Sequence, residues 1–418
     1  MQTKEKIYFK TFGCRTNIYD TELLKGYVTD YELARDESEA DIVIVNSCTV
    51  TNGADSGVRA YINALQNKGV KIVLTGCGAA SKGKEMLDKK VILGVLGAGN
   101  KSQINALLKQ GREFYEVNAL NFIDKDIVTR FENHTKAFVK IQEGCDYACS
   151  YCIIPSVRGK SRSISEDTLI KQVQILADNG YTEFVLTGTN IGSYGRKDGT
   201  TLGRLLQKLG AVNGVKRIRL GSLEPAQIDE SFIEILSEPW IERHLHIALQ
   251  HTSEKMLRLM RRRSHIDDDL ALFELLRGKG YALGTDFIVA HPGESADIWA
   301  QALANFKKFA LTHLHAFIFS PRSGTHSALM KNDISGDTAK ARLNELKSIV
   351  LQNNFEFRAK LARQKIPLNV LVESRKNGFW EGYDEFYNKI KIKSNENLSK
   401  RWLKIQHYEA RESGNFAL

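Results

Sequence analysis

The chain has 418 residues, of which 42% are hydrophobic and 26% are charged, a length and composition typical of a globular protein with two or three domains. No apolar run approaches the roughly 18 residues that a membrane-spanning helix needs, and the charged start MQTKEKIYFK lacks the apolar region of a signal peptide. We therefore expect a cytoplasmic protein that does not enter a membrane. The net charge of +10 is compatible with a polyanionic partner but is also common in proteins that bind none.

Strand and helix patterns alternate along residues 1–112, which we define as the N-terminal domain. Apolar runs predict strands at residues 7–14, 41–48, 70–77 and 91–99, and helical periodicity lies between them. Such alternation is typical of a parallel sheet covered by helices, whose functional loops lie at the carboxyl ends of the strands.

The cysteines of this domain share one position in the pattern, because each directly follows a strand. They are Cys14, Cys48 and Cys77. The carboxyl ends of parallel strands meet at one edge of a sheet, so we expect a three-thiolate site there that holds a 4Fe-4S cluster with one iron left open. The alternative is that these are unrelated buried cysteines.

Residues 113–130 lack a clear pattern and are interpreted as a linker. Residues 131–363 form the next predicted unit, in which six strands alternate with helices; the strands are expected at 136–142, 182–188, 215–221, 244–250, 283–293 and 313–320. Six such repeats around a pocket predict a partial TIM-like (β/α)6 barrel with its active site at the carboxyl ends of the strands. Helical periodicity from residue 337 to about residue 363 predicts a long closing helix.

The loop after the first barrel strand carries Cys145, Cys149 and Cys152 in a C-x3-C-x2-C array. Thiolates this close together predict a 4Fe-4S cluster in which three irons are held and one stays open for a ligand. A zinc ion would require a fourth Cys or His at short spacing, and this loop has no histidine. Incidental buried cysteines are the remaining alternative.

Residues 364–418 show short alternating strands, which predict a small β-barrel. Aromatic residues are interleaved there with lysines: Phe379, Trp380, Tyr383, Tyr387 and Trp402. Rings beside cations suit base stacking and phosphate contacts in an RNA-binding module. The alternative is that about half of these rings belong to the core.

The C-x3-C-x2-C array resembles that of the radical S-adenosylmethionine (SAM) superfamily, in which the open iron binds SAM. The resemblance implies that Tyr151, between the last two cysteines, lies near the adenine of SAM. The order of the three units, with three cysteines in the first, is similar to the methylthiotransferase family, whose C-terminal TRAM module binds RNA in its tRNA-modifying members. This resemblance implies two 4Fe-4S clusters and SAM as cofactors.

Four segments are most similar to the branch of this family that acts on N6-threonylcarbamoyladenosine in tRNA: TGTNIGSYG (187–195), RIRLGSLEP (217–225), CIIPSVRGKSRS (152–163) and MRRR (260–263). We therefore expect a tRNA-modifying enzyme that methylthiolates C2 of this nucleoside beside the anticodon. The alternatives are methylthiolation of N6-isopentenyladenosine in tRNA or of an aspartate in a ribosomal protein. A non-enzymatic iron-sulfur RNA sensor and a structural zinc protein are disfavoured by the open irons and the missing fourth ligands.

The resemblance also implies how the two thiolate sets divide the reaction. The cluster on the C-x3-C-x2-C array reduces SAM and cleaves it to a 5′-deoxyadenosyl radical, which takes hydrogen from C2 of the adenine. Sulfur on the open iron of the N-terminal cluster, methylated by a second SAM, then forms the new bond. The implied partners are the tRNA anticodon stem-loop and a one-electron reductant such as flavodoxin or ferredoxin.

The family pattern further implies which residues surround SAM. They follow the second, third and fourth barrel strands: Gly188, Thr189, Asn190, Ser222, Glu224 and Gln250. The chain departs from that pattern near Gln250, at Ala248, His251 and Thr252, and we interpret His251 as a hydrogen-bonding residue and not as an acid or base. Basic residues after the cysteine array either hold a substrate phosphate or are simply solvated: Arg158, Lys160 and Arg162.

Overall fold

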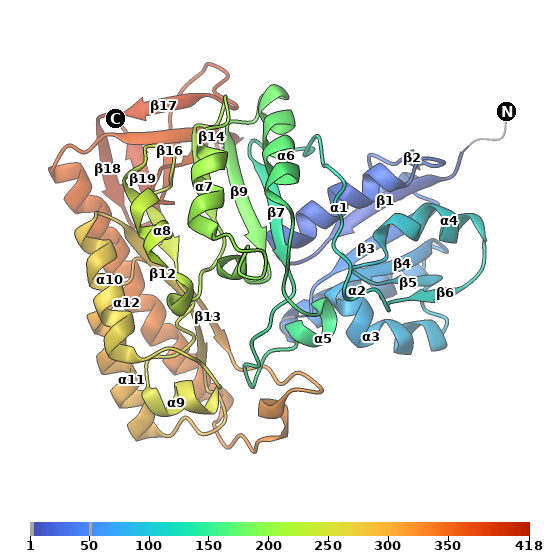
Figure 1. Cartoon of the computed structure of the whole chain (residues 1–418), viewed down its shortest axis with the longest axis horizontal. Coiled ribbons are helices and arrows are strands. Elements are labelled where there is room, and N and C mark those ends of the chain that lie inside the picture. Colours follow the sequence, from blue (N-terminus) through green and yellow to red (C-terminus); the bar gives the residue numbers. More distant parts are fainter. Residues whose placement is uncertain (1–3, 50–51) are drawn as a thin grey trace.

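The N-terminal domain is a parallel sheet in the order β2-β1-β3-β4-β5-β6, seen in blue tones in the computed structural model, which describes residues 4–49 and 52–418 (Figure 1). The strands are β1 Lys6–Thr11, β2 Glu32–Leu33, β3 Ile42–Ser47, β4 Lys71–Gly76, β5 Gly94–Leu96 and β6 Phe114–Glu116. The helices are α1 Arg15–Tyr27, α2 Asn52–Gln66, α3 Cys77–Asp88 and α4 Ile104–Lys109, with short 3-10 helices at Glu37–Glu39 and Lys101–Gln103.

Strand β3 explains why this sheet needs helices on both faces. All of its residues are buried, and alternate side chains point to opposite faces. Ile42 and Ile44 pack in the same cluster as apolar residues of α1 and α4, whereas Val43 and Val45 pack with those of α2 and α3. A continuous apolar run of this kind is what a doubly covered parallel strand requires.

The sheet continues into the segment that the sequence predicts as a linker, because β6 lies within residues 113–130. It pairs in parallel with β5, where Gly94 faces Phe114. A Cβ atom at Gly94 would lie 2.3 Å from the Phe114 ring, so the glycine makes room for that ring. A strand of only three residues is too short to produce a visible alternation in the sequence.

The central domain is a half-open barrel of parallel strands, as the sequence predicts. The strands are β7 Ala137–Glu143, β9 Glu183–Gly188, β10 Arg217–Leu220, β11 His244–His246, β12 Ala282–Val289 and β13 His313–Ile318, and a short β8 Arg162–Ser163 pairs antiparallel to β7. Hydrogen bonds pair β10 with β9 and β9 with β7 in one group, and β11 with β12 and β12 with β13 in the other. Isolated bridges, Ile218 to Ile241 and Leu223 to Ile247, connect these two groups into one curved wall.

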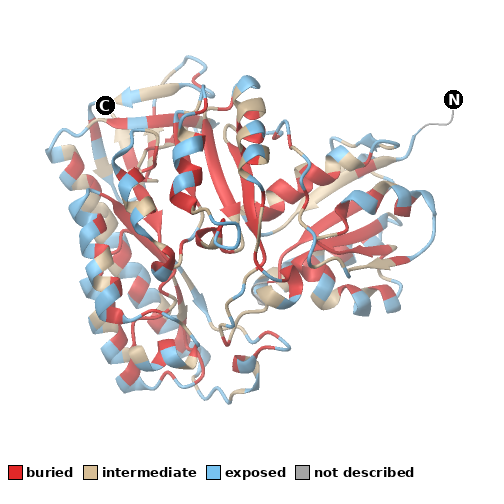
Figure 2. Ribbon diagram, viewed as in Figure 1, coloured by how far each residue is buried: buried red, intermediate tan, exposed pale blue. Residues whose placement is uncertain are grey.

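Helices cover the outer side of this wall, and the largest apolar cluster of the molecule lies between them and the strands. They are α6 Glu166–Asp178, α7 Leu202–Gly210, α8 Glu230–Glu234, α9 Glu254–Leu259, α10 Ile266–Gly278, α11 Ala296–Lys308 and α12 Gly336–Arg363. The short helix α5, Ile154–Arg158, instead lies beside α3 of the N-terminal domain (Figure 1). Short 3-10 helices occur at Ile191–Ser193, Pro225–Gln227, Ile235–Ser237 and His326–Leu329. Figure 2 shows the resulting pattern, with buried strands inside and exposed outer faces on the helices.

The C-terminal domain is a curled sheet in the order β17-β14-β15-β16-β19-β18. Its strands are β14 Leu368–Lys376, β15 Phe379–Tyr383, β16 Lys389–Ile392, β17 Trp402–Ile405, β18 Tyr408–Arg411 and β19 Gly414–Ala417. Its core contains Trp380, and the Trp402 indole donates to the Thr182 hydroxyl of the central domain, with 2.8 Å between Nε1 and Oγ1. These two rings therefore serve packing, which favours the core alternative over base stacking for both.

Arg219 on β10 connects the barrel to this C-terminal sheet. Its buried guanidinium lies 2.9 Å from a Glu183 oxygen and 3.1 Å from a Glu242 oxygen, and it donates to the Asp384 carbonyl at 2.7 Å. A charge can be buried in this way because carboxylates and a carbonyl satisfy its donors.

The described residues include no helix long and apolar enough to cross a membrane.

Replacing Arg219 by Met should lower the free energy of unfolding by about 3–5 kcal/mol, because Glu183 and Glu242 would stay buried without the guanidinium that contacts both. Urea denaturation followed by circular dichroism measures this change. The control is Lys84→Met, which removes an exposed ion pair with Asp88 and should leave the unfolding curve in place. An Arg219→Met curve that coincides with the wild-type curve would contradict the role given to this charge.

Candidate active site

A cavity of about 640 Å³ lies at the carboxyl ends of the barrel strands and is lined by all three domains. The N-terminal domain contributes Cys14 and Arg15, and the C-terminal domain contributes Tyr387. Loops that follow the barrel strands supply the remaining lining, as expected for a barrel of this type.

The first thiol set, Cys145, Cys149 and Cys152, lies in the loop after β7, and all three cysteines line the cavity. The chain leaves the strand at Gly144, which has a φ of +77° and where a Cβ atom would lie 2.0 Å from the Lys160 carbonyl oxygen. Only glycine fits this turn. The Cys145 amide donates to the Gly159 carbonyl at 3.0 Å, so the loop is held closed on itself.

The electrostatics of these thiols suit a cationic metal group. Burial raises the pKa of Cys149, although the nearby Arg262 guanidinium lowers it, and burial raises the pKa of Cys152 to about 12. The other thiols of the set raise both values further, since thiolates so close together repel each other. Iron would supply the positive charge that stabilises all three as thiolates, so the donor set fits an iron-sulfur cluster.

The second thiol set comes from three strand ends of the N-terminal domain, with Cys14 after β1, Cys48 after β3 and Cys77 after β4. The loops approach closely at Gly13, which has a φ of +99° and where a Cβ atom would lie 2.5 Å from the Cβ of Cys48. Cys14 lines the cavity, whereas Cys48 and Cys77 are buried behind it. The strand ends thus bring these cysteines together at one edge of the sheet, as the topology predicts.

The position of Arg158 contradicts both alternatives that the sequence offered, because the side chain is neither solvated nor available to a substrate phosphate. Its guanidinium is buried, with Nη1 2.7 Å from an Asp20 oxygen and 2.5 Å from a Glu143 oxygen, and Nε 3.2 Å from the sulfur of Cys77. Burial raises the pKa of Cys77, whereas this guanidinium lowers it. The loop of the first thiol set therefore carries a cation that contacts the second set, which no local pattern could indicate.

The other two basic residues of that loop differ from Arg158. Lys160 is exposed, whereas the Arg162 guanidinium donates to the carbonyls of Arg158 and Lys160, at 3.1 and 2.6 Å. Arg162 therefore supports the turn of the loop, and Lys160 is the one of the three that matches the solvated alternative.

All of the residues predicted around SAM line the cavity: Tyr151, Gly188, Thr189, Asn190, Ser222, Glu224 and Gln250. Buried oxygens of Thr189 and Asn190 have no hydrogen-bond partner among the described residues, which fits a polar ligand beside them. Glu224 accepts two hydrogen bonds from Arg262, at 2.8 and 2.6 Å, so its carboxylate is held in place by that cation.

His251 is a buried hydrogen-bonding residue, as interpreted from the sequence. Its Nδ1 accepts from the Ser253 amide at 3.0 Å, and its Nε2 lies 3.4 Å from a Glu294 oxygen. Its neighbour Gln250 has a φ of +65°, so the chain turns sharply where it departs from the family pattern.

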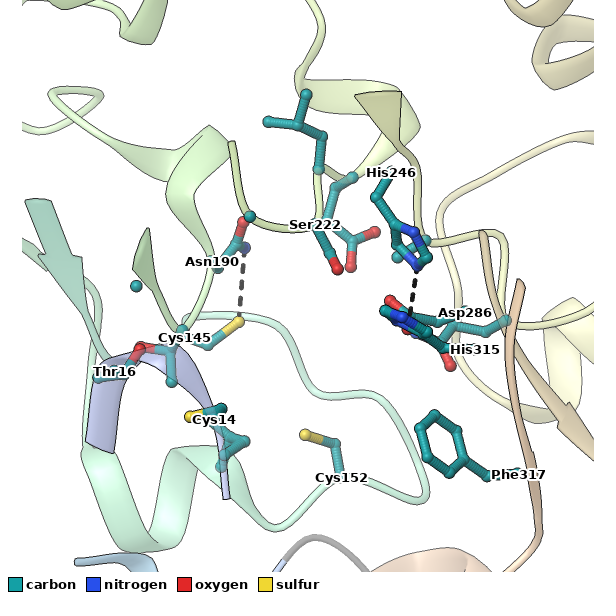
Figure 3. Close-up of a pocket in the computed structure, with 18 of the residues that line it drawn as sticks. Cys14, Thr16, Cys145, Cys152, Asn190, Ser222, His246, Asp286, His315 and Phe317 are labelled. Atoms are coloured by element: carbon teal, nitrogen blue, oxygen red, sulfur yellow. Dashed lines mark hydrogen bonds and ion pairs between the residues drawn. The ribbon is translucent and has the colours of Figure 1, made fainter. Parts of the chain in front are cut away.

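A wall of histidines on β11 and β13 is the feature that the sequence interpretation missed. His246 Nε2 lies 3.2 Å and His315 Nδ1 lies 3.6 Å from an Asp286 oxygen, across the cavity from Cys145 and Cys152 (Figure 3). The signal was present, because the tripeptide HLH occurs in both strands and period-two alternation places its histidines on one face.

Comparison with known proteins agrees with this architecture. The model of the uncharacterized protein family UPF0004 matches residues 6–97, and that of the radical SAM superfamily matches residues 139–304. A Helicobacter pylori (strain J99) protein named as a methylthiotransferase is 46% identical over 99% of this chain and 100% of its own length. The chain belongs to the radical SAM methylthiotransferase family.

Other relatives carry names that include a substrate. The threonylcarbamoyladenosine tRNA methylthiotransferase MtaB of Bacillus subtilis is 32% identical over 97% of this chain and 94% of its own. The tRNA-2-methylthio-N(6)-dimethylallyladenosine synthase of Fervidobacterium nodosum is also 32% identical, over 92% of each chain. The two substrate names thus occur at equal identity, and identity alone does not choose between them.

The fold of this methylthiotransferase is also similar to a solved structure, the radical SAM methyltransferase TsrM of Kitasatospora setae, with a TM-score of 0.60 and 14% identity over 83% of this chain and 91% of the other. Membership of the radical SAM superfamily implies SAM and a 4Fe-4S cluster. The first thiol set and the unpartnered polar atoms beside it suit these two groups.

Proposed function

We propose that this methylthiotransferase acts on tRNA and adds a methylthio group to C2 of N6-threonylcarbamoyladenosine beside the anticodon. The observation that carries the proposal is that both thiol sets reach one cavity, through Cys14 on one side and the C-x3-C-x2-C array on the other. A reaction that needs hydrogen removal and sulfur transfer at one carbon requires both sites within reach of the same atom. Relatives named as tRNA methylthiotransferases support tRNA as the substrate.

In this proposal each thiol set holds a 4Fe-4S cluster. When bound, the two clusters supply the reductive cleavage of SAM and the sulfur that is transferred, with electrons from a one-electron reductant such as flavodoxin or ferredoxin. The protein itself positions the reactants and excludes water. Arg158 stabilises negative charge on Cys77, and Arg262 does so on Cys149, since each guanidinium contacts the sulfur.

The SAM cradle in this proposal follows the three strands β9, β10 and β11. Gly188, Thr189 and Asn190 receive the amino acid part of SAM, Ser222 and Glu224 face its ribose, and Gln250 and Tyr151 lie beside its adenine. Each of them lines the cavity. Asn190 also lies 3.6 Å from the sulfur of Cys145, so a ligand it holds would be next to the first thiol set.

The cavity has a mixed lining with more apolar than polar surface, and its basic side chains are the part that suits a polar nucleoside substituent. Three arginines and four histidines line it: Arg15, Arg262, Arg322, His244, His246, His313 and His315. Arg262 and Arg322 already pair with carboxylates, so Arg15 is the arginine that decides. A hydrocarbon tail such as a dimethylallyl group would cover its guanidinium without forming hydrogen bonds, which costs free energy, whereas a threonylcarbamoyl group offers carbonyl, hydroxyl and carboxylate oxygens. Dimethylallyladenosine is therefore the second candidate substrate.

The domain plan of the proposal starts from the predicted boundaries of 1–112, 113–130, 131–363 and 364–418 and moves the first one, because β6 belongs to the N-terminal sheet. The thiol-bearing sheet then spans residues 1–116 and the linker 117–130, followed by the SAM-binding barrel and a TRAM-like RNA-binding domain. Exposed lysines of the last domain form no ion pair with any described residue: Lys376, Lys393, Lys400 and Lys404. Unpaired surface cations are what backbone phosphates attract.

Deleting the gene should remove 2-methylthio-N6-threonylcarbamoyladenosine from digested cellular tRNA and make its unthiolated precursor accumulate. Mass spectrometry of the nucleosides measures both. If the dimethylallyl nucleoside lost its methylthio group instead, the second candidate substrate would replace the first. If neither nucleoside changed, the proposal of a tRNA substrate would be wrong.

Cysteine replacements should separate the two thiol sets. Cys149→Ala should abolish 5′-deoxyadenosine formation from SAM, because the cluster loses a ligand, whereas Cys77→Ala should retain that activity and stop methylthiolation. Chromatography of SAM products and the nucleoside assay measure the two steps. Normal methylthiolation by Cys77→Ala would remove the second cluster from the mechanism.

Replacing Lys376 and Lys393 together by Ala should weaken tRNA binding and reduce the slope of log Kd against log salt by about one for each phosphate that the protein no longer neutralises. A salt series of anisotropy titrations measures the slope. The control is Lys84→Ala on the N-terminal domain, which should leave it unchanged. Equal slopes for the double variant and the wild type would show that these lysines do not contact RNA.

A further inference from the structure

Arg15 occupies a special place because its side chain connects the three domains at the cavity. It follows Cys14 directly and is the first residue of α1. Its Nη1 donates to the Leu220 carbonyl at the end of β10, at 3.3 Å, and its Nη2 donates to the Tyr387 hydroxyl of the C-terminal domain, at 3.1 Å. The guanidinium is thus fixed at the cavity surface next to the second thiol set.

Within the part of the chain that the structure describes, Arg15 has no carboxylate partner of the kind that the other two arginines of the cavity have. Arg262 contacts Glu224, and Arg322 contacts Asp55. By contrast, both hydrogen bonds of Arg15 go to uncharged oxygens, and among the described residues it forms no ion pair within 4 Å. The carboxylate of Glu242 also feels the charge of Arg15, but it is paired with Arg219 at 3.1 Å. A guanidinium has five N–H donors in a planar fork, so donors remain for an anion.

The histidines beside Arg15 do not supply a second free cation. Burial, followed by the charges of His313, His246, Arg219 and Arg15, holds the pKa of His244 well below its usual range. Burial and the neighbouring His246 lower the pKa of His313 to about 3. The neutral His244 ring stacks on Tyr387 with 5.3 Å between ring centroids, so Arg15 stands at the edge of a flat aromatic wall.

We propose that Arg15, held by the Tyr387 hydroxyl, is an anion subsite that binds the terminal carboxylate of the substituent on N6 of the substrate adenine. This inference rests on the proposed function, because a threonylcarbamoyl group ends in a carboxylate and a dimethylallyl group does not. N6 is attached to C6, and C6 and C2 flank N1 of the same ring, so a side chain next to Cys14 can hold the substituent while C2 faces the thiol sets. A carboxylate pairs with the guanidinium fork, whereas a hydrocarbon would leave that charge desolvated and unpaired.

The test compares two RNA hairpins that differ only in the N6 substituent, threonylcarbamoyl or dimethylallyl, in anisotropy titrations at one salt concentration. Phosphate contacts are the same for both, so the ratio of the two Kd values reports the substituent. Arg15→Met should weaken binding of the threonylcarbamoyl hairpin roughly 10- to 100-fold and leave the dimethylallyl hairpin unchanged. Arg15→Lys should show a smaller loss, since it keeps the charge without the fork.

The control is Arg204→Met, which makes the same change at an exposed position of α7 and should not alter the ratio. Tyr387→Phe is a second test variant, remote in sequence from the cysteines, and should weaken binding of the threonylcarbamoyl hairpin a few-fold because Arg15 loses its support. If the Arg15→Met protein fails to load iron, the Tyr387→Phe variant alone tests whether Arg15 binds the substituent.

The outcomes separate the inference from the function on which it rests. If the wild type prefers the threonylcarbamoyl hairpin and Arg15→Met or Tyr387→Phe loses that preference, Arg15 is the subsite. If the wild type has the preference and both variants keep it, the inference is wrong and the proposed function stands. If the wild type binds and methylthiolates the dimethylallyl hairpin instead, the proposed function itself fails.

Discussion

A cluster of buried charges between the N-terminal domain and the barrel is the interaction on which the rest of the molecule depends. Asp20 of α1 lies 2.7 Å from Arg158 and 2.7 Å from Lys140 of β7, and Lys140 also contacts Glu143 at 3.2 Å. Burial alone would raise the pKa of Asp20, but Lys101, Lys140 and Arg158 together hold it well below its usual range. The group stays ionised because every charge has an opposite partner within contact distance.

This cluster determines where the two thiol sets lie relative to each other. Helix α1 begins directly after Cys14 and carries Asp20, while Arg158 belongs to the loop of the first thiol set. The same helix forms a hydrogen bond to the barrel through Thr16 and Thr187, with 3.0 Å between the hydroxyls. Buried ion pairs contribute little net stability but tolerate few alternative arrangements, so they suit an interface whose register has to be unique.

Regular elements with a strong period were the part of the fold that could be predicted. The long helix expected from residue 337 lies at Gly336–Arg363, and the barrel strands appear where apolar runs end in polar loops. Short elements such as β6 and β8 were not predicted, because two or three residues show no periodicity. The aromatic rings of the C-terminal domain could not be assigned for a related reason: a tryptophan in a strand has the same sequence context whether it faces RNA, the core or another domain.

The sequence by itself determined where the two groups of cysteines gather, since cysteine spacing within one loop and cysteines at successive strand ends are local patterns that the backbone converts directly into positions. Only the tertiary structure decided that Cys14 of the second set reaches the cavity lined by the first set, and that Arg158 and Arg15 connect these cysteines to their surroundings. Arg158 contacts a cysteine 81 positions away, and Arg15 contacts a tyrosine 372 positions away. Contacts at such separations depend on how folded domains dock, and docking leaves no period or spacing in the chain.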